Sequence, residues 1–223
     1  MNTALQGPAP DQASAISARL RACLELQRQT YLAQPNPGLQ QRKADLLQLK
    51  RMISENRETI IGAINLDYGN RSRHETLIAE ILFVLDSINF IRSRLRNWMK
   101  PQKRHVDFMT YPGAHNRVIP QPLGVVGVIV PWNFPIQLSF GPLAYIFSAG
   151  NRAIVKMSEN SGALARLLIE ICPRYFPPEK LAFFEETGEV GIQFSRLPFD
   201  HLLFTGSAQT GRDVMAAAAK NLT

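Results

Sequence analysis

Residues 125–130 constrain this chain most, because they form an unbroken apolar run that is mostly β-branched, Val-Val-Gly-Val-Ile-Val. Such a run is typical of a strand buried on both faces of a parallel sheet. Helices and strands are predicted to alternate after it, in the order helix 136–149, strand 153–156, helix 161–171, strand 181–184, strand 201–204 and helix 208–222. This alternation predicts βαβ crossovers and therefore a doubly wound, mostly parallel α/β sheet.

The first hundred residues have a different pattern, with apolar residues at helical spacing. They predict three long helices. The first ends before the turn at 35–38, the second runs to about Gly69, and the third ends before Pro101. These N-terminal helices precede the sheet along the chain.

Residues 105–122 are rich in β-forming residues, with candidate strands at 105–109 and 117–119 around Pro112-Gly113. A hairpin that projects from the body and an edge pair on the main sheet both fit this pattern. The predicted organisation is a helical segment at 1–104, a β-hairpin arm at 105–122 and an α/β region at 123–223.

The chain carries a net charge of +7, and residues 1–104 hold all of the excess, with 16 Lys/Arg against 9 Asp/Glu. The densest basic stretch is 92–104, which as a non-catalytic basic module could bind nucleic acid. A solvated helix end, where cations complement the helix dipole, explains the same stretch. We favour the solvated helix end and expect no nucleic-acid partner, because no aromatic stacking pattern or zinc-finger spacing accompanies the charge.

The composition excludes several other classes of protein. No apolar run reaches the ~18 residues that a membrane span needs, so we expect no membrane partner. The only cysteines, Cys23 and Cys172, cannot supply a disulfide framework or a four-cysteine metal site. We therefore expect a cytoplasmic protein without a metal site.

Polar side chains follow three of the predicted strands, at the edge where doubly wound sheets bind ligands. After the first strand, two prolines flank Asn133, whose amide could donate to an oxyanion or could cap the next helix. After the second, Lys156 and Glu159 could bracket a ribose, or the segment could serve only to begin a helix. After the last, Gly206 and Ser207 at a helix N-terminus could cradle a phosphate.

These three segments together resemble the NAD(P)-dependent aldehyde dehydrogenases. The matching stretches are Leu123–Pro135, Lys156–Glu159 and Phe204–Ser207, in the same order and at similar separations. Residues 197–206 look closest to the coniferyl aldehyde dehydrogenases. The resemblance extends from about residue 15 to the last residue and implies a Rossmann-like fold, although no GxGxxG fingerprint is present.

The resemblance implies a role for each matched residue. Asn133 matches the asparagine that holds the oxyanion. Lys156 and Glu159 match the pair that binds the adenosine ribose, and Ser207 with Gly206 matches the pyrophosphate contact. The segment that lines the cofactor cleft matches Ile129, Val130, Pro131 and Trp132. The implied reaction is oxidation of an aldehyde to the carboxylic acid, with coniferyl aldehyde as the expected substrate and a fatty or other aromatic aldehyde as the alternative.

The resemblance also implies a cofactor and a partner. The cofactor is NAD or NADP, and Glu185-Glu186, where many members have small residues, favours NAD because carboxylates there disfavour a 2′-phosphate. The family carries a β-arm used in oligomer contacts, so we expect a homo-oligomer when the protein is full length.

One part of the family's catalytic machinery has no match in this sequence. The family needs a nucleophilic cysteine and a general-base glutamate, and neither Cys23 nor Cys172 lies at the nucleophile's place. Both read as buried small hydrophobic residues. We therefore expect the sequence to stop before the catalytic domain and the chain alone to be inactive.

Overall fold

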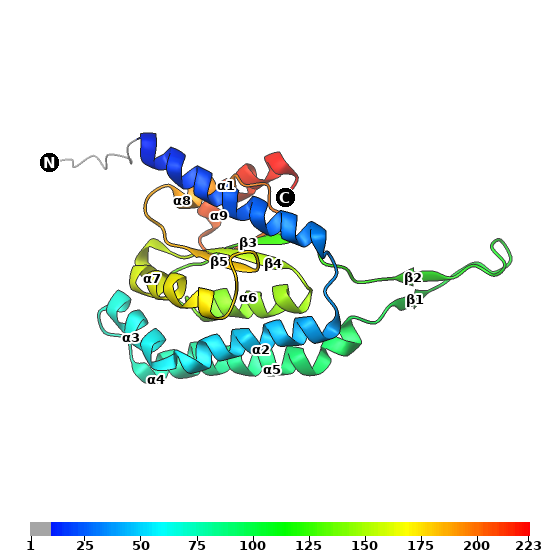
Figure 1. Ribbon diagram of the computed structural model, residues 1–223, viewed down its shortest axis with the longest axis horizontal. Coiled ribbons are helices and arrows are strands. Elements are labelled where there is room, and N and C mark those ends of the chain that lie inside the picture. Colours follow the sequence, from blue (N-terminus) through cyan, green and yellow to red (C-terminus); the bar gives the residue numbers. More distant parts are fainter. Residues whose placement is uncertain (1–9) are drawn as a thin grey trace.

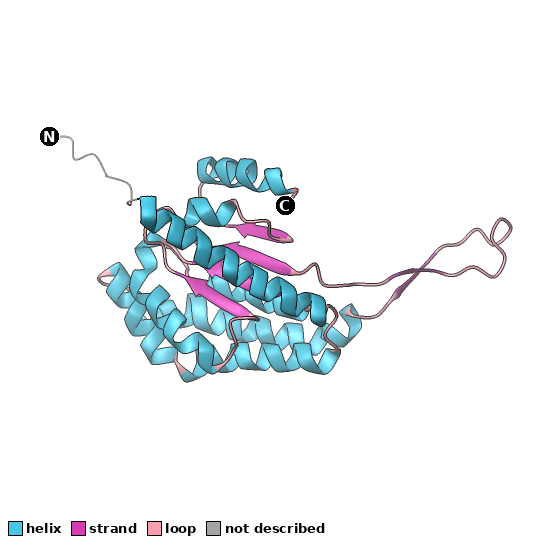
Figure 2. Cartoon of the chain, turned by 45° about the horizontal axis from the view of Figure 1, so that its top comes forward, coloured by secondary structure: helices cyan, strands magenta, loops and turns pink. Residues whose placement is uncertain are grey.

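The computed structural model describes residues 10–223, which fold into a four-stranded sheet with helices on both faces and a separate two-stranded arm (Figures 1 and 2). The helices are α1 (Pro10–Ala33), α2 (Leu39–Glu55), α3 (Arg57–Tyr68), α4 (Arg73–Glu75), η1 (Thr76–Leu82), α5 (Phe83–Trp98), α6 (Gln137–Ser148), η2 (Glu159–Ser161), α7 (Gly162–Ile171), η3 (Cys172–Arg174), α8 (Val190–Ser195), α9 (Ala208–Ala218) and η4 (Ala219–Asn221). The strands are β1 (Gln102–Arg104), β2 (Asn116–Val118), β3 (Val125–Ile129), β4 (Arg152–Lys156), β5 (Leu181–Phe184) and β6 (His201–Phe204). No helix within this range is both long and apolar enough to cross a membrane.

The main sheet confirms the predicted doubly wound, parallel arrangement. Its strand order is β5-β4-β3-β6, and all three pairings are parallel. Helices α1, α8 and α9 cover one face, and α6 and α7 cover the other (Figure 1). Helices α2 and α5 lie outside α6, so this side of the molecule has a second helical layer (Figure 1).

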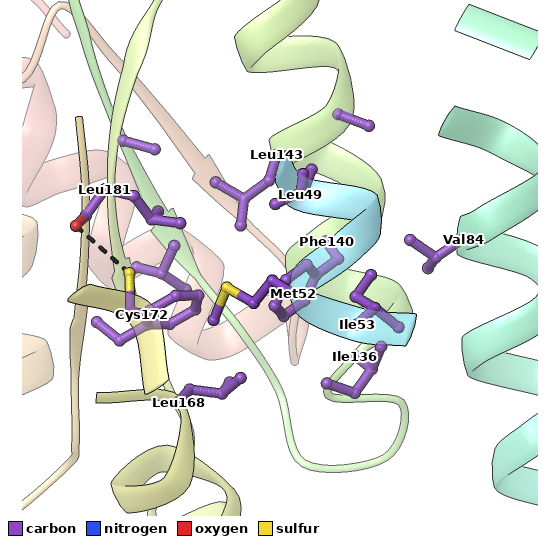
Figure 3. Packing of buried hydrophobic residues seen from close by; sticks show 14 of the residues in the cluster. Leu49, Met52, Ile53, Val84, Ile136, Phe140, Leu143, Leu168, Cys172 and Leu181 are labelled. Carbon is purple, nitrogen blue, oxygen red and sulfur yellow. Dashed lines mark hydrogen bonds between the residues drawn. The ribbon is translucent and has the colours of Figure 1, made fainter. Parts of the chain in front are cut away.

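Strand β3 supplies both hydrophobic cores because successive side chains point to opposite faces of a sheet. Val126 and Val128 belong to the larger core, which α2, α3, α5, α6 and α7 complete (Figure 3). Val125 and Ile129 belong to the smaller core under α1 and α8. Gly127 lies between them without a side chain, because a Cβ there would come within 2.7 Å of the Phe199 ring.

The helical region departs from the prediction at two places. The predicted second helix is two helices, α2 and α3, separated at Asn56. The Asn56 amide donates to the Met52 carbonyl at 2.8 Å and to the Tyr175 hydroxyl at 2.9 Å, and such side-chain bonds compete with a continuous helix. In the predicted third helix, residues 76–82 form a π-helix that leads into α5.

The β1–β2 pair is an arm that extends away from the body (Figure 2) and forms no part of the main sheet. Its first strand lies at 102–104, three residues before the start of the predicted one at 105–109. The Asp107 carboxylate accepts from the backbone N–H of Met109 at 3.1 Å, which folds that segment into a turn instead of a strand.

Candidate functional site

The ends of β3, β4 and β6 bring the predicted site residues to one edge of the sheet. These strands are parallel neighbours in the order β4-β3-β6, so the segments that follow them emerge side by side. The segments carry Asn133, Lys156 with Glu159, and Gly206 with Ser207. Ligands bind at this edge in doubly wound sheets.

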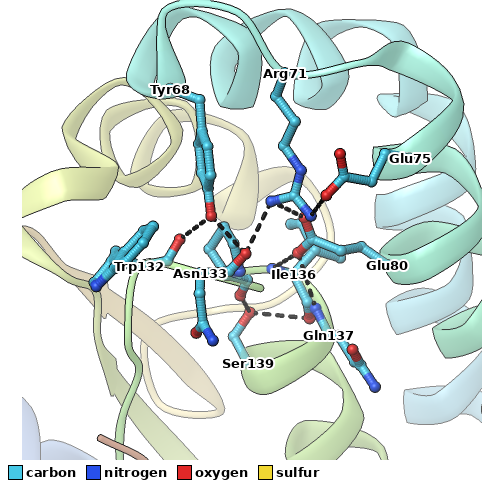
Figure 4. A network of polar contacts seen from close by, with 10 residues as sticks. Tyr68, Arg71, Glu75, Glu80, Trp132, Asn133, Ile136, Gln137 and Ser139 are labelled. Atoms are coloured by element: carbon cyan, nitrogen blue, oxygen red, sulfur yellow. Dashed lines mark hydrogen bonds and ion pairs between the residues drawn. The ribbon is translucent and has the colours of Figure 1, made fainter. Parts of the chain in front are cut away.

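The Asn133 loop is held by its backbone. The Tyr68 hydroxyl donates to the Trp132 carbonyl at 2.7 Å and also to the Asn133 carbonyl (Figure 4). The Arg71 guanidinium donates to the same Asn133 carbonyl at 2.9 Å. In residues 10–223 the exposed Asn133 side chain has no hydrogen bond to protein, so its amide is available to a ligand.

The Glu80 carboxylate takes the capping role that sequence reasoning left open for Asn133. One Glu80 oxygen accepts from the backbone N–H groups of Ile136 at 2.7 Å and Gln137 at 3.3 Å, at the start of α6 (Figure 4). The Asn133 side chain does not cap this helix. The structure therefore excludes the capping interpretation of Asn133, and its role as a donor to an oxyanion stays a prediction.

Glu80 forms a buried ion pair with Arg71. A Glu80 carboxylate oxygen lies 3.0 Å from the Arg71 guanidinium, and the side chains of Glu80 and Arg71 are 0% and 3% exposed, respectively. The Arg71 guanidinium lies between the Tyr68 ring at 4.7 Å and the Phe134 ring at 5.1 Å. Burial raises the pKa of Glu80, while the Ile136 N–H and the Arg71 charge oppose that rise. Glu80 comes from the π-helix, so an irregular segment supplies the group that fixes the site.

Lys156 and Glu159 differ in their surroundings. Lys156 is 7% exposed, and its ammonium lies 2.8 Å from a Glu186 carboxylate oxygen. Glu159 is exposed at the start of η2, where the Ser158 hydroxyl accepts from the Asn160 N–H at 3.2 Å. The Ser158 bond begins the short helix η2, not the predicted helix 161–171, and the sequence did not predict the partner of Lys156.

The start of α9 is capped by its own chain. The Ser207 hydroxyl accepts from the Thr210 N–H at 3.2 Å and lies 2.8 Å from the Thr210 hydroxyl. A Cβ on Gly206 would come within 2.5 Å of the Phe204 ring. The packing of Phe204 therefore favours glycine at this position.

Helix α9 also differs from the helices that precede it in the sheet region. Carboxylates of Glu80, Asp67 and Glu186 accept from the first N–H groups of α6, α7 and α8. Within residues 10–223, α9 receives no carboxylate from another element. A negative ligand is therefore accommodated better at α9 than at the other three helix starts.

The remaining predicted residues contribute unequally to this edge. Ile129 and Val130 are 7% and 2% exposed, and their side chains lie in the smaller and larger cores, respectively. Trp132 is 52% exposed and packs its ring 5.9 Å from that of Tyr68. Only backbone atoms of the first two can reach a ligand, whereas Trp132 offers a ring face.

Neither cysteine belongs to this edge. Cys172 is buried in the larger core, where its thiol donates to the Leu181 carbonyl at 3.7 Å (Figure 3). Cys23 packs against the smaller core from α1. Burial raises the pKa of the Cys23 thiol to about 11 and that of the Cys172 thiol to about 12, which leaves both protonated at neutral pH.

Comparison with known proteins identifies the family of this chain. The model of the aldehyde dehydrogenase family matches residues 12–223. The chain belongs to the aldehyde dehydrogenase family. The resemblance seen in the three strand-end segments is thereby confirmed.

The relatives of this family member include coniferyl aldehyde dehydrogenases. A probable coniferyl aldehyde dehydrogenase of Pseudomonas aeruginosa is 47% identical over 92% of the chain, and the coniferyl aldehyde dehydrogenase of a Pseudomonas species is 45% identical over 92%. The chain spans 43% and 42% of their lengths.

Solved structures agree with the fold. The substrate-bound state of Staphylococcus aureus AldH superposes with a TM-score of 0.86 and 29% identity, over 92% of this chain and 44% of that one. PnpE in complex with nicotinamide adenine dinucleotide has a TM-score of 0.79 at 23% identity, over 93% of this chain and 42% of that one. At that identity the second likeness shows the fold alone.

Three residues of the site were not predicted from the sequence: Tyr68, Arg71 and Glu80. A single signal pointed to Glu80, which is the one acid inside the apolar segment Leu77–Leu82. Nothing local marks Tyr68 or Arg71 as residues that hold the Asn133 loop, because the loop carbonyls that they contact lie more than 60 positions away in the sequence.

Glu80→Ala tests the anchor beneath the site. The change removes the acceptor at the start of α6 and leaves the Arg71 charge buried without Glu80, so we expect a loss of about 3–5 kcal/mol in the free energy of unfolding. Urea denaturation followed by circular dichroism measures it. Glu75→Ala is the matched control, because Glu75 also pairs with Arg71 but is 54% exposed, and it should cost less than about 1 kcal/mol. Equal losses in the two variants would contradict the anchoring role.

Proposed function

We propose that this chain is the dinucleotide-binding part of an enzyme that oxidises an aldehyde to the carboxylic acid. The observation that carries the proposal is the unbonded Asn133 amide, displayed on a fixed loop at the ligand-binding edge of the sheet. An amide N–H held in this way can donate to the oxygen that becomes negative when a nucleophile adds to an aldehyde. Because the loop is already fixed, little reorganisation accompanies that step.

The cofactor that we propose is NAD. The N-terminus of α9, with Ser207 and Gly206, suits a pyrophosphate because no other carboxylate occupies it. The exposed Glu159 carboxylate suits the ribose hydroxyls, since a carboxylate accepts from a hydroxyl donor. The proposed cleft also includes Lys156, the Trp132 ring and the backbone atoms of Ile129, Val130 and Pro131. Bound NAD would supply the hydride acceptor for the oxidation.

The nucleophile in this proposal comes from outside the chain. A thiolate is the nucleophile in covalent catalysis by cysteine, and burial keeps both thiols of this chain protonated. The contribution of this chain is therefore to bind the dinucleotide and to donate from Asn133.

For the substrate we propose coniferyl aldehyde, with a fatty or other aromatic aldehyde as the alternative. The support is the names of the two Pseudomonas relatives and a mostly apolar groove of about 580 Å³ along α6, the helix that follows the Asn133 loop. Phe83, Tyr145 and Leu203 line its walls. Both free cysteines fit a reducing compartment, so we assign the enzyme to the cytoplasm. Of the two classes that the sequence left open, the family match supports the enzyme over a basic nucleic-acid-binding module.

Ser207→Asp tests the pyrophosphate site without removing the helix cap. Aspartate caps helices as well as serine does but places a negative charge where the diphosphate would lie, so NADH should bind at least about tenfold more weakly. Fluorescence titration of the chain with NADH measures the affinity. Ser207→Asn, a cap without the charge, should stay within about threefold of the wild type. Undiminished affinity in the aspartate variant would exclude the site. Gly206 is less suitable for this test, because a side chain there also collides with Phe204.

The chain alone should not oxidise aldehydes. Asn133 can stabilise an oxyanion only after a nucleophile has formed one, and both thiols pack in or against the hydrophobic cores instead of at this edge. The measurement is NADH formation from NAD with a panel containing coniferyl aldehyde, benzaldehyde and a long-chain alkanal. The Cys23→Ser/Cys172→Ser double variant serves as the control. Turnover that disappears in the double variant would refute the assignment of the nucleophile.

We further propose that the arm binds a second copy of the chain. It carries large apolar side chains that the body leaves uncovered, with Phe108, Met109 and Tyr111 exposed by 69%, 90% and 63%. Exposed apolar clusters of this kind mark contact surfaces. Homo-oligomer formation through the arm would bury them.

Replacing residues 102–118 with a short Gly-Ser linker tests this contact. The wild-type chain should sediment as a dimer or larger species, and the deletion should shift it toward the monomer because the apolar contact is lost. Leu66→Ser, which removes an apolar side chain that is 74% exposed on α3, is the control and should leave the mass unchanged. Identical masses for the deletion variant and the wild type would reject the proposal.

A further inference from the structure

The Lys156 ammonium already has an anionic partner within the chain. Its Nζ lies 2.8 Å from Oε2 of Glu186, and the two side chains are 9% and 14% exposed. Lys156 ends β4 at the ligand-binding edge, whereas Glu186 lies in the loop that follows β5. The cation that the proposed ribose site offers is therefore neutralised before any ligand arrives.

The Glu186 carboxylate is fixed in position by the backbone of α8. Oε1 accepts from the Val190 N–H at 2.9 Å, and Oε2 accepts from the Gly191 N–H at 2.8 Å. Gly191 leaves room for this contact, because a Cβ there would lie 3.0 Å from Oε2 and 3.4 Å from the Lys156 ammonium. With three partners, the carboxylate cannot turn away from Lys156 without losing hydrogen bonds.

The two neighbouring carboxylates differ from Glu186 in their surroundings. Glu159 is exposed near the same strand end, and Glu185 forms its ion pair with Arg166 on α7. Of these three carboxylates, Glu186 is the one that pairs with Lys156 within residues 10–223. A ribose 2′-hydroxyl is neutral and can donate to such a carboxylate, whereas a 2′-phosphate adds about 1.5 to 2 negative charges and requires a free cation.

We infer that Glu186 is a specificity-determining residue that makes this chain select NAD over NADP, because its carboxylate occupies the Lys156 ammonium that a 2′-phosphate would need. The inference rests on the proposed function, since it assumes that the dinucleotide ribose lies beside Lys156. It goes further than that function in assigning the selection to one residue, and it separates Glu186 from its neighbour Glu185.

Paired titrations with NADH and NADPH, followed by fluorescence, test the inference on the 223-residue chain. The wild type should bind NADH at least about tenfold more tightly than NADPH, as repulsion by a fixed charge at short range implies. Glu186→Gln keeps the size of the side chain and removes its charge, so its NADPH affinity should rise about tenfold while its NADH affinity stays within about threefold. Glu185→Gln removes the same charge one position away and should preserve the wild-type preference, because Glu185 pairs with Arg166.

The outcomes separate this inference from the proposed function. Equal binding of NADH and NADPH by the wild type would overturn the inference alone, as would an unchanged preference in Glu186→Gln or an equal relaxation in Glu185→Gln. Binding of neither dinucleotide would overturn the proposed function and the inference together. Circular dichroism shows whether the variants are folded, and if Glu186→Gln does not fold, Glu186→Ser, which also removes the charge, takes its place with the same expected gain in NADPH affinity.

Discussion

The Glu80 carboxylate joins the two parts of this molecule. It comes from the helical N-terminal region, yet its hydrogen-bond partners are the first N–H groups of α6 in the α/β region. Asp67 on α3 does the same for α7, with contacts of 2.7 and 3.0 Å to Ala163 and Leu164. Helix starts need acceptors, and buried ones cannot obtain them from water. The N-terminal helices therefore form one packed unit with the α/β region and are not an addition to it.

The sequence predicted the main sheet because its strands are specified locally. Short apolar runs between predicted helices placed β3, β4, β5 and β6 almost to the residue, and Gly69 marked a helix end in the left-handed conformation, at φ 78°. The elements that the sequence did not predict depend on contacts between distant residues or are very short. The break at Asn56 depends on Tyr175, more than a hundred positions away, and α8 is only six residues long and begins under the Glu186 carboxylate.

In the candidate site, too, the positions of residues could be predicted from the local pattern, whereas the contacts that hold them could not. Parallel strands bring their ends together whatever the side chains are, so Asn133, Lys156 and Ser207 could be placed at one edge from the pattern alone. Which groups hold these residues could not be read from spacing, because the holding contacts cross between elements. Arg71 reaches the Asn133 carbonyl across 62 positions, and Glu186 meets Lys156 across a complete βαβ unit.

The two cations near the candidate site, Arg71 and Lys156, are each paired with a carboxylate. The Arg71 charge behind the Asn133 loop is balanced by Glu80, and the Lys156 charge is balanced by Glu186, so neither offers an unpaired cation to an oxyanion. In the proposed reaction, stabilisation from this chain must then come from a neutral, oriented dipole, the Asn133 amide. Such a dipole acts only if its direction is fixed in advance. The Tyr68 and Arg71 contacts to the loop carbonyls fix that backbone while leaving the amide itself unbonded.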